Sequence, residues 1–153
     1  MGTLAVLITL SGCSLFGGGD MMSQPEEVRE FVRLMNQHRQ AQGLQTLQWD
    51  SSLGQVALDH SQDMLARDFF SHENPDGESP FDRMAAAGIS YSSAGENIAA
   101  GYSYSTGEAV LDGWLNSTNH KENIENTSYT HHGVGYVADG NYWTHVFASG
   151  SGF

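Results

Sequence analysis

The sequence contains very little cysteine and little positive charge. Its single cysteine is Cys13, so no internal disulfide can form and packing has to stabilise the fold. Six lysines and arginines stand against eighteen aspartates and glutamates, which gives a formal net charge of −12. Because no basic stripe is available to neutralise phosphates, we expect neither a nucleic-acid partner nor direct adsorption to anionic lipid headgroups.

The sequence also lacks an apolar run of about 20 residues, the length that spans a bilayer. A shorter apolar run covers residues 3–10 and is typical of the central part of a secretory signal. It leads into Leu10-Ser11-Gly12-Cys13, which resembles the lipobox of bacterial lipoproteins. The resemblance implies that residues 1–12 are a signal peptide and that Cys13 is lipidated. A buried helix over residues 4–16 is the alternative.

The glycines that follow the cysteine predict how the anchored domain is attached. Gly17-Gly18-Gly19 is typical of a flexible linker, and we assign residues 13–22 to the lipidated cysteine and its tether. Residues 23–153 suit one domain that needs no metal or disulfide for its core, and we expect a monomer. The prediction is an exported protein of the cell envelope. Ser14 resembles a signal for sorting to an outer membrane.

Apolar residues at helical spacing predict four helices in this domain. Each begins after a residue that is suited to capping: Ser23, in an S-x-x-E capping box with Glu26, then Asp50, Ser79 and Thr106. The predicted helices cover about residues 25–42, 51–69, 80–87 and 107–115. Their early position in the chain leaves the C-terminal third for strands.

The C-terminal third changes to alternation of apolar and polar residues, which is typical of strands. Residues 134–138 and 142–147 alternate on either side of Asp139-Gly140-Asn141, and this pattern predicts a β-hairpin. Residues 95–99 form a third expected strand. Helices early and strands late predict an α+β fold in which the helices pack against a small antiparallel sheet.

Several motifs stand out against this scaffold, and their order in the chain is specific. They are Asn36-x-x-Arg39-x-x-x-Gly43-Leu44-x-x-Leu47, Phe70-Ser71-His72, Gly95-Glu96-Asn97-Ile98-Ala99, Trp114-x-x-Ser117-x-x-His120-x-x-Asn123-Ile124, Gly133-Val134-Gly135 and Tyr142-Trp143-Thr144. Together they resemble the bacterial, SCP-like branch of the CAP superfamily, named after cysteine-rich secretory proteins, antigen 5 and pathogenesis-related protein 1. The resemblance runs from about residue 28 to residue 148.

The resemblance implies a three-layer α-β-α sandwich with a wide cleft lined by two histidines and two acidic residues. Matched position by position, His72 is the first histidine and Glu96 the first acid. Ser117 stands where the eukaryotic pattern has a second glutamate, and Tyr142 stands where it has the second histidine. His120 fills the role of that histidine in the bacterial branch.

The chemistry of these side chains leaves several roles open. His72, His120 and Glu96 can hold zinc or another divalent metal, with the fourth position left for water or substrate. The same groups can act as general acid and base without a metal, and Glu96 is the candidate base. Glu96 can instead orient one imidazole, or the histidines can be hydrogen-bonded groups without any ligand. Asn97 and Ser117 are expected to support the site through hydrogen bonds.

The other histidines are expected to lie outside the site. His131 and His132 suit a solvated strand entry, and His60 suits the edge of the core within a helix. The pattern leaves open which face of its strand His145 occupies.

Two classes of function follow from these residues. The first is a non-catalytic binding module that presents its cleft to a metal, small ligand or partner protein. The second is a metal-dependent hydrolase acting on peptide or cell-envelope material, with Glu96 as ligand or base. The chain contains neither G-x-S-x-G nor H-E-x-x-H, so two common hydrolase routes are closed. We therefore favour the binding module.

Overall fold

The structure is a computed structural model that describes residues 20–153. The predicted signal peptide, the lipidation of Cys13 and most of the tether lie outside these residues. No helix between residues 20 and 153 is long and apolar enough to cross a membrane.

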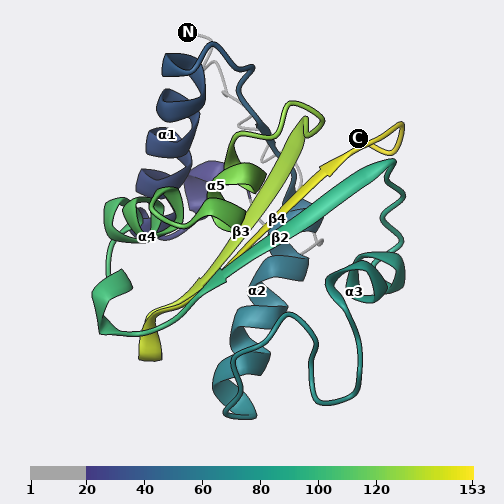
Figure 1. The fold of residues 1–153 in the computed structure, drawn as a ribbon. Helices are drawn as coiled ribbons and strands as arrows, with labels where there is room; N and C mark the ends of the chain where they lie inside the picture. Colours follow the sequence, from purple (N-terminus) through teal and green to yellow (C-terminus); the bar gives the residue numbers. More distant parts are fainter. Residues whose placement is uncertain (1–19) are drawn as a thin grey trace, which may run out of the picture.

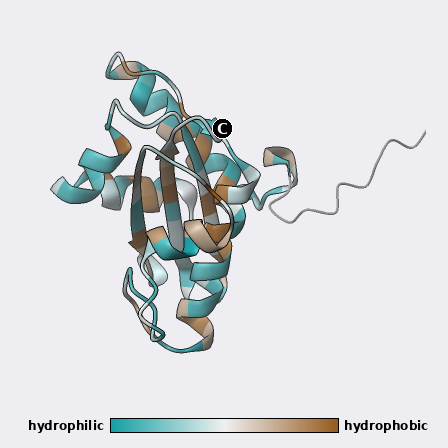
Figure 2. Ribbon diagram, turned by 90° about the vertical axis from the view of Figure 1, so that its right-hand side faces the viewer, coloured by the Kyte–Doolittle hydropathy of each residue, from teal (hydrophilic) through white to brown (hydrophobic). Residues whose placement is uncertain are grey.

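The described chain forms three layers, as the resemblance predicted. The middle layer is a four-stranded sheet, covered on one face by α1 (Glu26–Ala41), α4 (Gly107–Leu115) and α5 (Thr118–Ile124). Helices α2 (Ser51–Ala66) and α3 (Pro80–Ala86) lie on the other side (Figure 1). Buried apolar residues form clusters where the helices pack on the sheet. Much of the helix ribbon is hydrophilic, with hydrophobic segments between (Figure 2).

The sheet has the strand order β1-β3-β4-β2. The predicted hairpin is confirmed: β3 (His131–Val137) and β4 (Tyr142–Ser149) are antiparallel, with the short helical turn η3 (Asp139–Asn141) between them. Strand β2 (Ser93–Ala99) pairs antiparallel with β4, also as expected. The three predicted strands are antiparallel, and an unpredicted strand makes the sheet mixed, because β1 (Gln48–Trp49) pairs parallel with β3. Two paired residues are too few to leave an alternating pattern in the sequence.

Three of the four predicted helix caps are present. Asp50, Ser79 and Thr106 each accept a hydrogen bond from a backbone N–H in the first turn of α2, α3 and α4. The capping box at Ser23 is wrong: Pro25 is the N-cap of α1, and the Ser23 hydroxyl donates to the Asp20 carbonyl instead. That bond belongs to η1 (Met21–Ser23), a single 3-10 turn that precedes α1.

One helix ends earlier than predicted, and one helix was not predicted. Helix α2 ends at Ala66, three residues before the predicted end at Phe69. Helix α5 was not predicted, because seven residues of mainly polar character carry little apolar periodicity.

Two glycines of β3 let α2 pack directly against the sheet. A Cβ atom on Gly133 would overlap the backbone nitrogen of Gly54, and one on Gly135 would overlap that of Leu58. Any side chain at either position would therefore push α2 away from β3.

Arg39 ties the end of α5 to α1 through a guanidinium that is almost fully buried. Its Nε donates to the Gln45 carbonyl at 2.8 Å, and its Nη1 donates to the carbonyls of Ile124 at 2.6 Å and Asn126 at 3.1 Å. Burial lowers the pKa of Arg39 below its ordinary value. The carbonyls of Ile124 and Asn126 lie at the C-terminus of α5 and just beyond it, where a cation interacts favourably with the helix dipole.

Two histidines are paired inside the core. His132 and His145 are both fully buried, and their Nδ1 and Nε2 atoms lie 3.0 Å apart. The expectation that His132 is solvated is therefore wrong, because β3 is covered on both faces. The His145 ring packs edge-on against Phe31 and stacks on Trp114. His60, as expected, is buried in α2.

We predict that the buried pair makes the domain lose stability in acid. Burial, with a smaller contribution from the Arg39 charge, lowers the pKa of His132 to about 3 and holds that of His145 well below 6.5. The stabilisation is therefore fully present above pH 6.5 and is lost as the pH falls from 6.5 towards about 3. Each imidazole contributes up to about 1.4 kcal/mol per pH unit in that range.

Urea unfolding followed from pH 8 to pH 4 measures this slope. His132→Gln should make the slope shallower, because about one proton fewer is taken up on unfolding. His131→Gln, which changes the partly exposed neighbour, should alter the slope far less, because the His131 charge only adds to the larger effect of burial on the His132 pKa. Equal slopes in the parent protein and His132→Gln would contradict the prediction.

Candidate functional site

A cleft of about 720 Å³ lies between the loop after α2, the end of β2, and helices α4 and α5. Its floor is largely apolar, and two imidazoles face it. The lining includes Phe70, His72, Ile98, Tyr104, Trp114 and His120. Another hollow of about 550 Å³ lies on the outer face of α1, beside η1, and its lining contains no histidine. The cleft is therefore where the predicted histidines meet.

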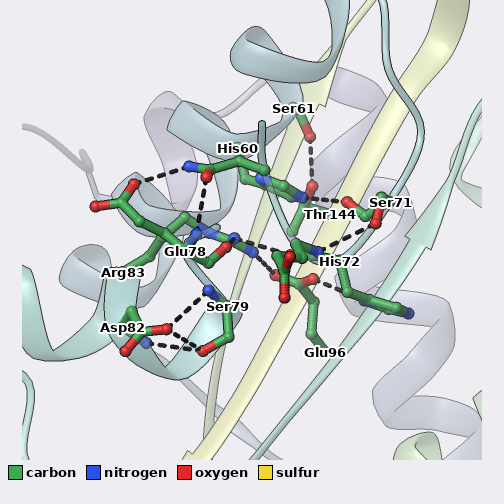
Figure 3. Close-up of polar contacts among 12 residues, drawn as sticks. His60, Ser61, Ser71, His72, Glu78, Ser79, Asp82, Arg83, Glu96 and Thr144 are labelled. Atoms are coloured by element: carbon green, nitrogen blue, oxygen red, sulfur yellow. Dashed lines mark hydrogen bonds and ion pairs between the residues drawn. The ribbon is translucent and has the colours of Figure 1, made fainter. Parts of the chain in front are cut away.

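His72 lies in the loop formed by residues 67–79 and is held from behind by Glu96 of β2 (Figure 3). Its Nδ1 is 2.8 Å from Oε1 of Glu96, whose side chain is only 2% exposed. The other carboxylate oxygen accepts a hydrogen bond from Nη2 of Arg83 at 2.8 Å. An ionised Glu96 can only accept, so Nδ1 of His72 carries a proton, and in the neutral imidazole Nε2 then keeps its lone pair.

His120 is held in a similar way from α5. Its Nδ1 lies 2.8 Å from the Ser117 hydroxyl. Ser117 is the N-cap of α5 but makes no side-chain capping bond. Its hydroxyl is directed to the histidine instead. Burial lowers the pKa of His120, and the nearby charge of His72 lowers it further.

Strand β2 positions α5 through the residue next to Glu96. The side-chain amide of Asn97 donates to the backbone carbonyl of His120 at 3.0 Å. The amide of Asn123 donates to Oδ1 of Asn97 at 2.8 Å and to the carbonyl of Glu96 at 3.2 Å. The hydrogen bonds expected of Asn97 and Ser117 are thus both present. Two consecutive residues of β2 therefore fix the two histidines: Glu96 holds the His72 side chain, and Asn97 holds the His120 backbone.

The structure brings His72 and His120 together at the cleft but places Glu96 behind His72 rather than in the lining. Within residues 20–153, no group of three or more histidine, cysteine, aspartate or glutamate side chains is arranged to hold a metal ion. Sequence reasoning missed Arg83. Two signals could have indicated it: Arg83 lies in a short capped helix soon after His72, and the chain has few basic residues.

A layered α-β-α fold whose cleft holds two imidazoles, one of them backed by an acidic residue of a strand, defines a class, and family comparison identifies it. The family model described as CAP, the cysteine-rich secretory protein family, matches residues 32–149. The chain therefore belongs to the CAP family.

Particular relatives come from several bacteria. Uncharacterized protein YkwD of Bacillus subtilis (strain 168) is 48% identical over 119 residues, which are 78% of this chain and 46% of the relative. Uncharacterized membrane protein YlbC of the same organism is 39% identical over 81% of this chain and 35% of its own length. The chain thus spans less than half the length of the curated relatives that it matches.

Solved structures show the same fold. An extracellular protein containing an SCP domain from Bacillus anthracis str. Ames has a TM-score of 0.75 and 36% identity, over 80% of this chain and 40% of that one. An outer surface protein from Borrelia burgdorferi has a TM-score of 0.74 and 23% identity, over 81% of this chain and 92% of that one. The second likeness shows the fold alone.

We predict that His120 senses the charge of His72 across the cleft. His72→Gln removes one of the groups that lower the His120 pKa, so this pKa should rise. It should stay below 6.5, because the burial of His120 remains. NMR titration of the imidazole signals measures the change, and His131→Gln is the control that should not produce it. An unchanged His120 titration in His72→Gln would contradict the shared cleft.

Proposed function

We propose that this protein is an exported, lipid-anchored CAP-domain protein that binds a ligand in its cleft through His72 and His120 without catalysing a reaction. One observation carries the proposal. Each imidazole has its Nδ1 held by a neighbouring side chain, and Nε2 of neither ring has a hydrogen-bond partner among residues 20–153. Two oriented nitrogens above an apolar floor form a recognition site.

A divalent metal such as zinc fits this pair of donors. Neutral imidazole is a common zinc ligand, and metal-bound histidines usually donate their other N–H to a carboxylate or another acceptor behind them. Glu96 stands in that position behind His72. Because both of its oxygens are engaged by His72 and Arg83, we assign Glu96 to orientation rather than ligation. The remaining ligands would come from water or the bound molecule.

The same contacts favour binding over hydrolysis. A metal-dependent hydrolase needs a base that can take a proton from a bound water. Glu96 is the candidate, yet its side chain is 2% exposed and lies between His72 and Arg83. The Ser117 hydroxyl is engaged with His120. The geometry therefore supports recognition as the function.

Sequence and family support the proposed location. The Bacillus anthracis relative, 36% identical, is described as an extracellular protein, and YlbC is described as a membrane protein. The lipobox-like sequence that ends at Cys13 supplies a way to export the domain and keep it at a membrane. Two or more acyl chains anchor a protein stably, whereas one chain anchors it weakly.

Calorimetric titration of zinc into the full chain at about pH 7.5, above the ordinary histidine pKa, tests the binding proposal. We expect one zinc per protein, lost in both His72→Ala and His120→Ala. Glu96→Gln should weaken binding by about 10- to 100-fold, the usual cost of removing a residue that orients a metal ligand. His131→Ala, a histidine outside the cleft, is the matched control. If the parent protein binds no zinc, the metal part of the proposal is wrong.

Fractionation of bacteria that express the full chain tests the anchor. The protein should sediment with membranes and incorporate a labelled fatty acid. Cys13→Ser should abolish both, because it removes the thiol that is alkylated. Serine replaces cysteine with a side chain of nearly the same size, so the domain itself should fold normally. Fatty-acid incorporation that persists in Cys13→Ser would exclude Cys13 as the anchor.

A further inference from the structure

Arg83 of α3 contacts three separate parts of the wall behind His72. Its Nη1 donates to the backbone carbonyl of His72 at 2.9 Å and to that of Glu78 at 3.0 Å. Its Nη2 donates to Oε2 of Glu96 at 2.8 Å. One guanidinium therefore joins the backbone of the loop, the end of that loop and the carboxylate that holds the imidazole (Figure 3).

Burial of the Glu96 carboxylate requires such a partner. Its side chain is 2% exposed, and a buried carboxylate is costly unless it is paired and hydrogen-bonded. The Arg83 side chain is itself only 11% exposed, so solvent screens this ion pair weakly. Among the described residues, His72 and Arg83 are the ion-pair partners of Glu96, and of the two only arginine carries its charge at every physiological pH.

The neighbouring acid does not compete for Arg83. Oδ2 of Asp82 accepts hydrogen bonds from both the backbone N–H and the hydroxyl of Ser79, in the capping box that begins α3. These bonds lower the pKa of Asp82. The guanidinium is left to reach across to β2 and to the loop.

We propose that Arg83 is a positioning residue for the cleft: it fixes both the Glu96 carboxylate and the loop backbone at His72, and thereby directs Nε2 of His72 into the cleft. A planar guanidinium can make these contacts at once, because its donors form a rigid fork. Without it, Glu96 loses the contact that fixes its second oxygen, and the loop loses two bonds to its carbonyls. The imidazole is then free to turn away. The inference rests on the proposed function only in assigning Nε2 to a ligand.

The tautomer of His72 is a readout that a purely structural role of Arg83 would not change. We would record long-range ¹H–¹⁵N correlations of the imidazoles in the full chain at about pH 8, where an ordinary histidine is neutral. In the parent protein His72 should be a single tautomer with its proton on Nδ1. In Arg83→Gln its nitrogen signals should shift towards the average of the two tautomers. The His120 signals should stay in place.

Arg67→Gln is the matched control. Arg67 pairs with Asp63 and Asp76, so it ties the same loop to α2, but it has no contact with His72 or Glu96. Its substitution should leave the His72 tautomer unchanged. Arg83→Lys keeps the charge but cannot span all three acceptors, so it should give a smaller shift in the same direction. If Arg83→Gln does not fold, Arg83→Lys is the variant in which the His72 tautomer is measured.

A single His72 tautomer in folded Arg83→Gln, or in Arg83→Lys if Arg83→Gln does not fold, would overturn the proposal. Arg83 would then stabilise the fold without orienting the site. The measurement needs no ligand, so it separates this inference from the proposed function. A protein that binds no zinc but loses its single tautomer in Arg83→Gln would disprove the metal site and support the role of Arg83.

Discussion

The architecture depends on the close approach of α2 to β3. Gly133 and Gly135 have no side chains, and the helix backbone occupies the space where those side chains would stand. At this distance Ser61 of α2 can donate to the carbonyl of Gly135 and lie 2.8 Å from the hydroxyl of Thr144. The helix leads directly into the loop that carries His72. A shift of α2 would therefore move one wall of the cleft.

Strand β2 fixes the position of α5, the other wall of the cleft, relative to the loop that carries His72. Successive side chains of a strand point to opposite faces, so Glu96 reaches the loop and α3 while Asn97 reaches α5. The cleft is thus assembled from segments far apart in the sequence. Two consecutive residues of one strand set the distance between the His72 loop and α5. Arg39 holds the C-terminal end of α5, so the short helix that carries His120 is fixed at both ends.

Much of this arrangement was accessible from the sequence, for identifiable reasons. Helix caps at Asp50, Ser79 and Thr106 act locally, so three of four were predicted correctly. Ser23 failed because a preceding turn uses its hydroxyl, which only the position of Asp20 reveals. The meeting of His72, Glu96 and His120 came from resemblance, since these residues are 24 or more positions apart in the chain and local patterns do not report such contacts.

Other features needed the three-dimensional structure. The burial of His132 follows from coverage of β3 on both faces, and alternation within the strand does not show it. The role of Glu96 behind His72, rather than beside it, depends on Arg83 occupying the second oxygen. Contacts between side chains of α3, β2 and a loop leave no regular pattern of residue spacing in the sequence. The sequence could therefore identify His72, Glu96 and His120, but neither Arg83 nor the role that each side chain takes.

The way the His72 loop is held has an evolutionary consequence. Its long-range anchors include the backbone carbonyls of Ser71, His72 and Glu78, which accept hydrogen bonds from His60 and Arg83. Every amino acid supplies such a carbonyl. Phe70 and Glu73, which also line the cleft, can therefore be exchanged without giving up these anchors. The fold separates the backbone contacts that hold the loop from the side chains that line the cleft, which lets that lining diverge while the imidazole stays in place.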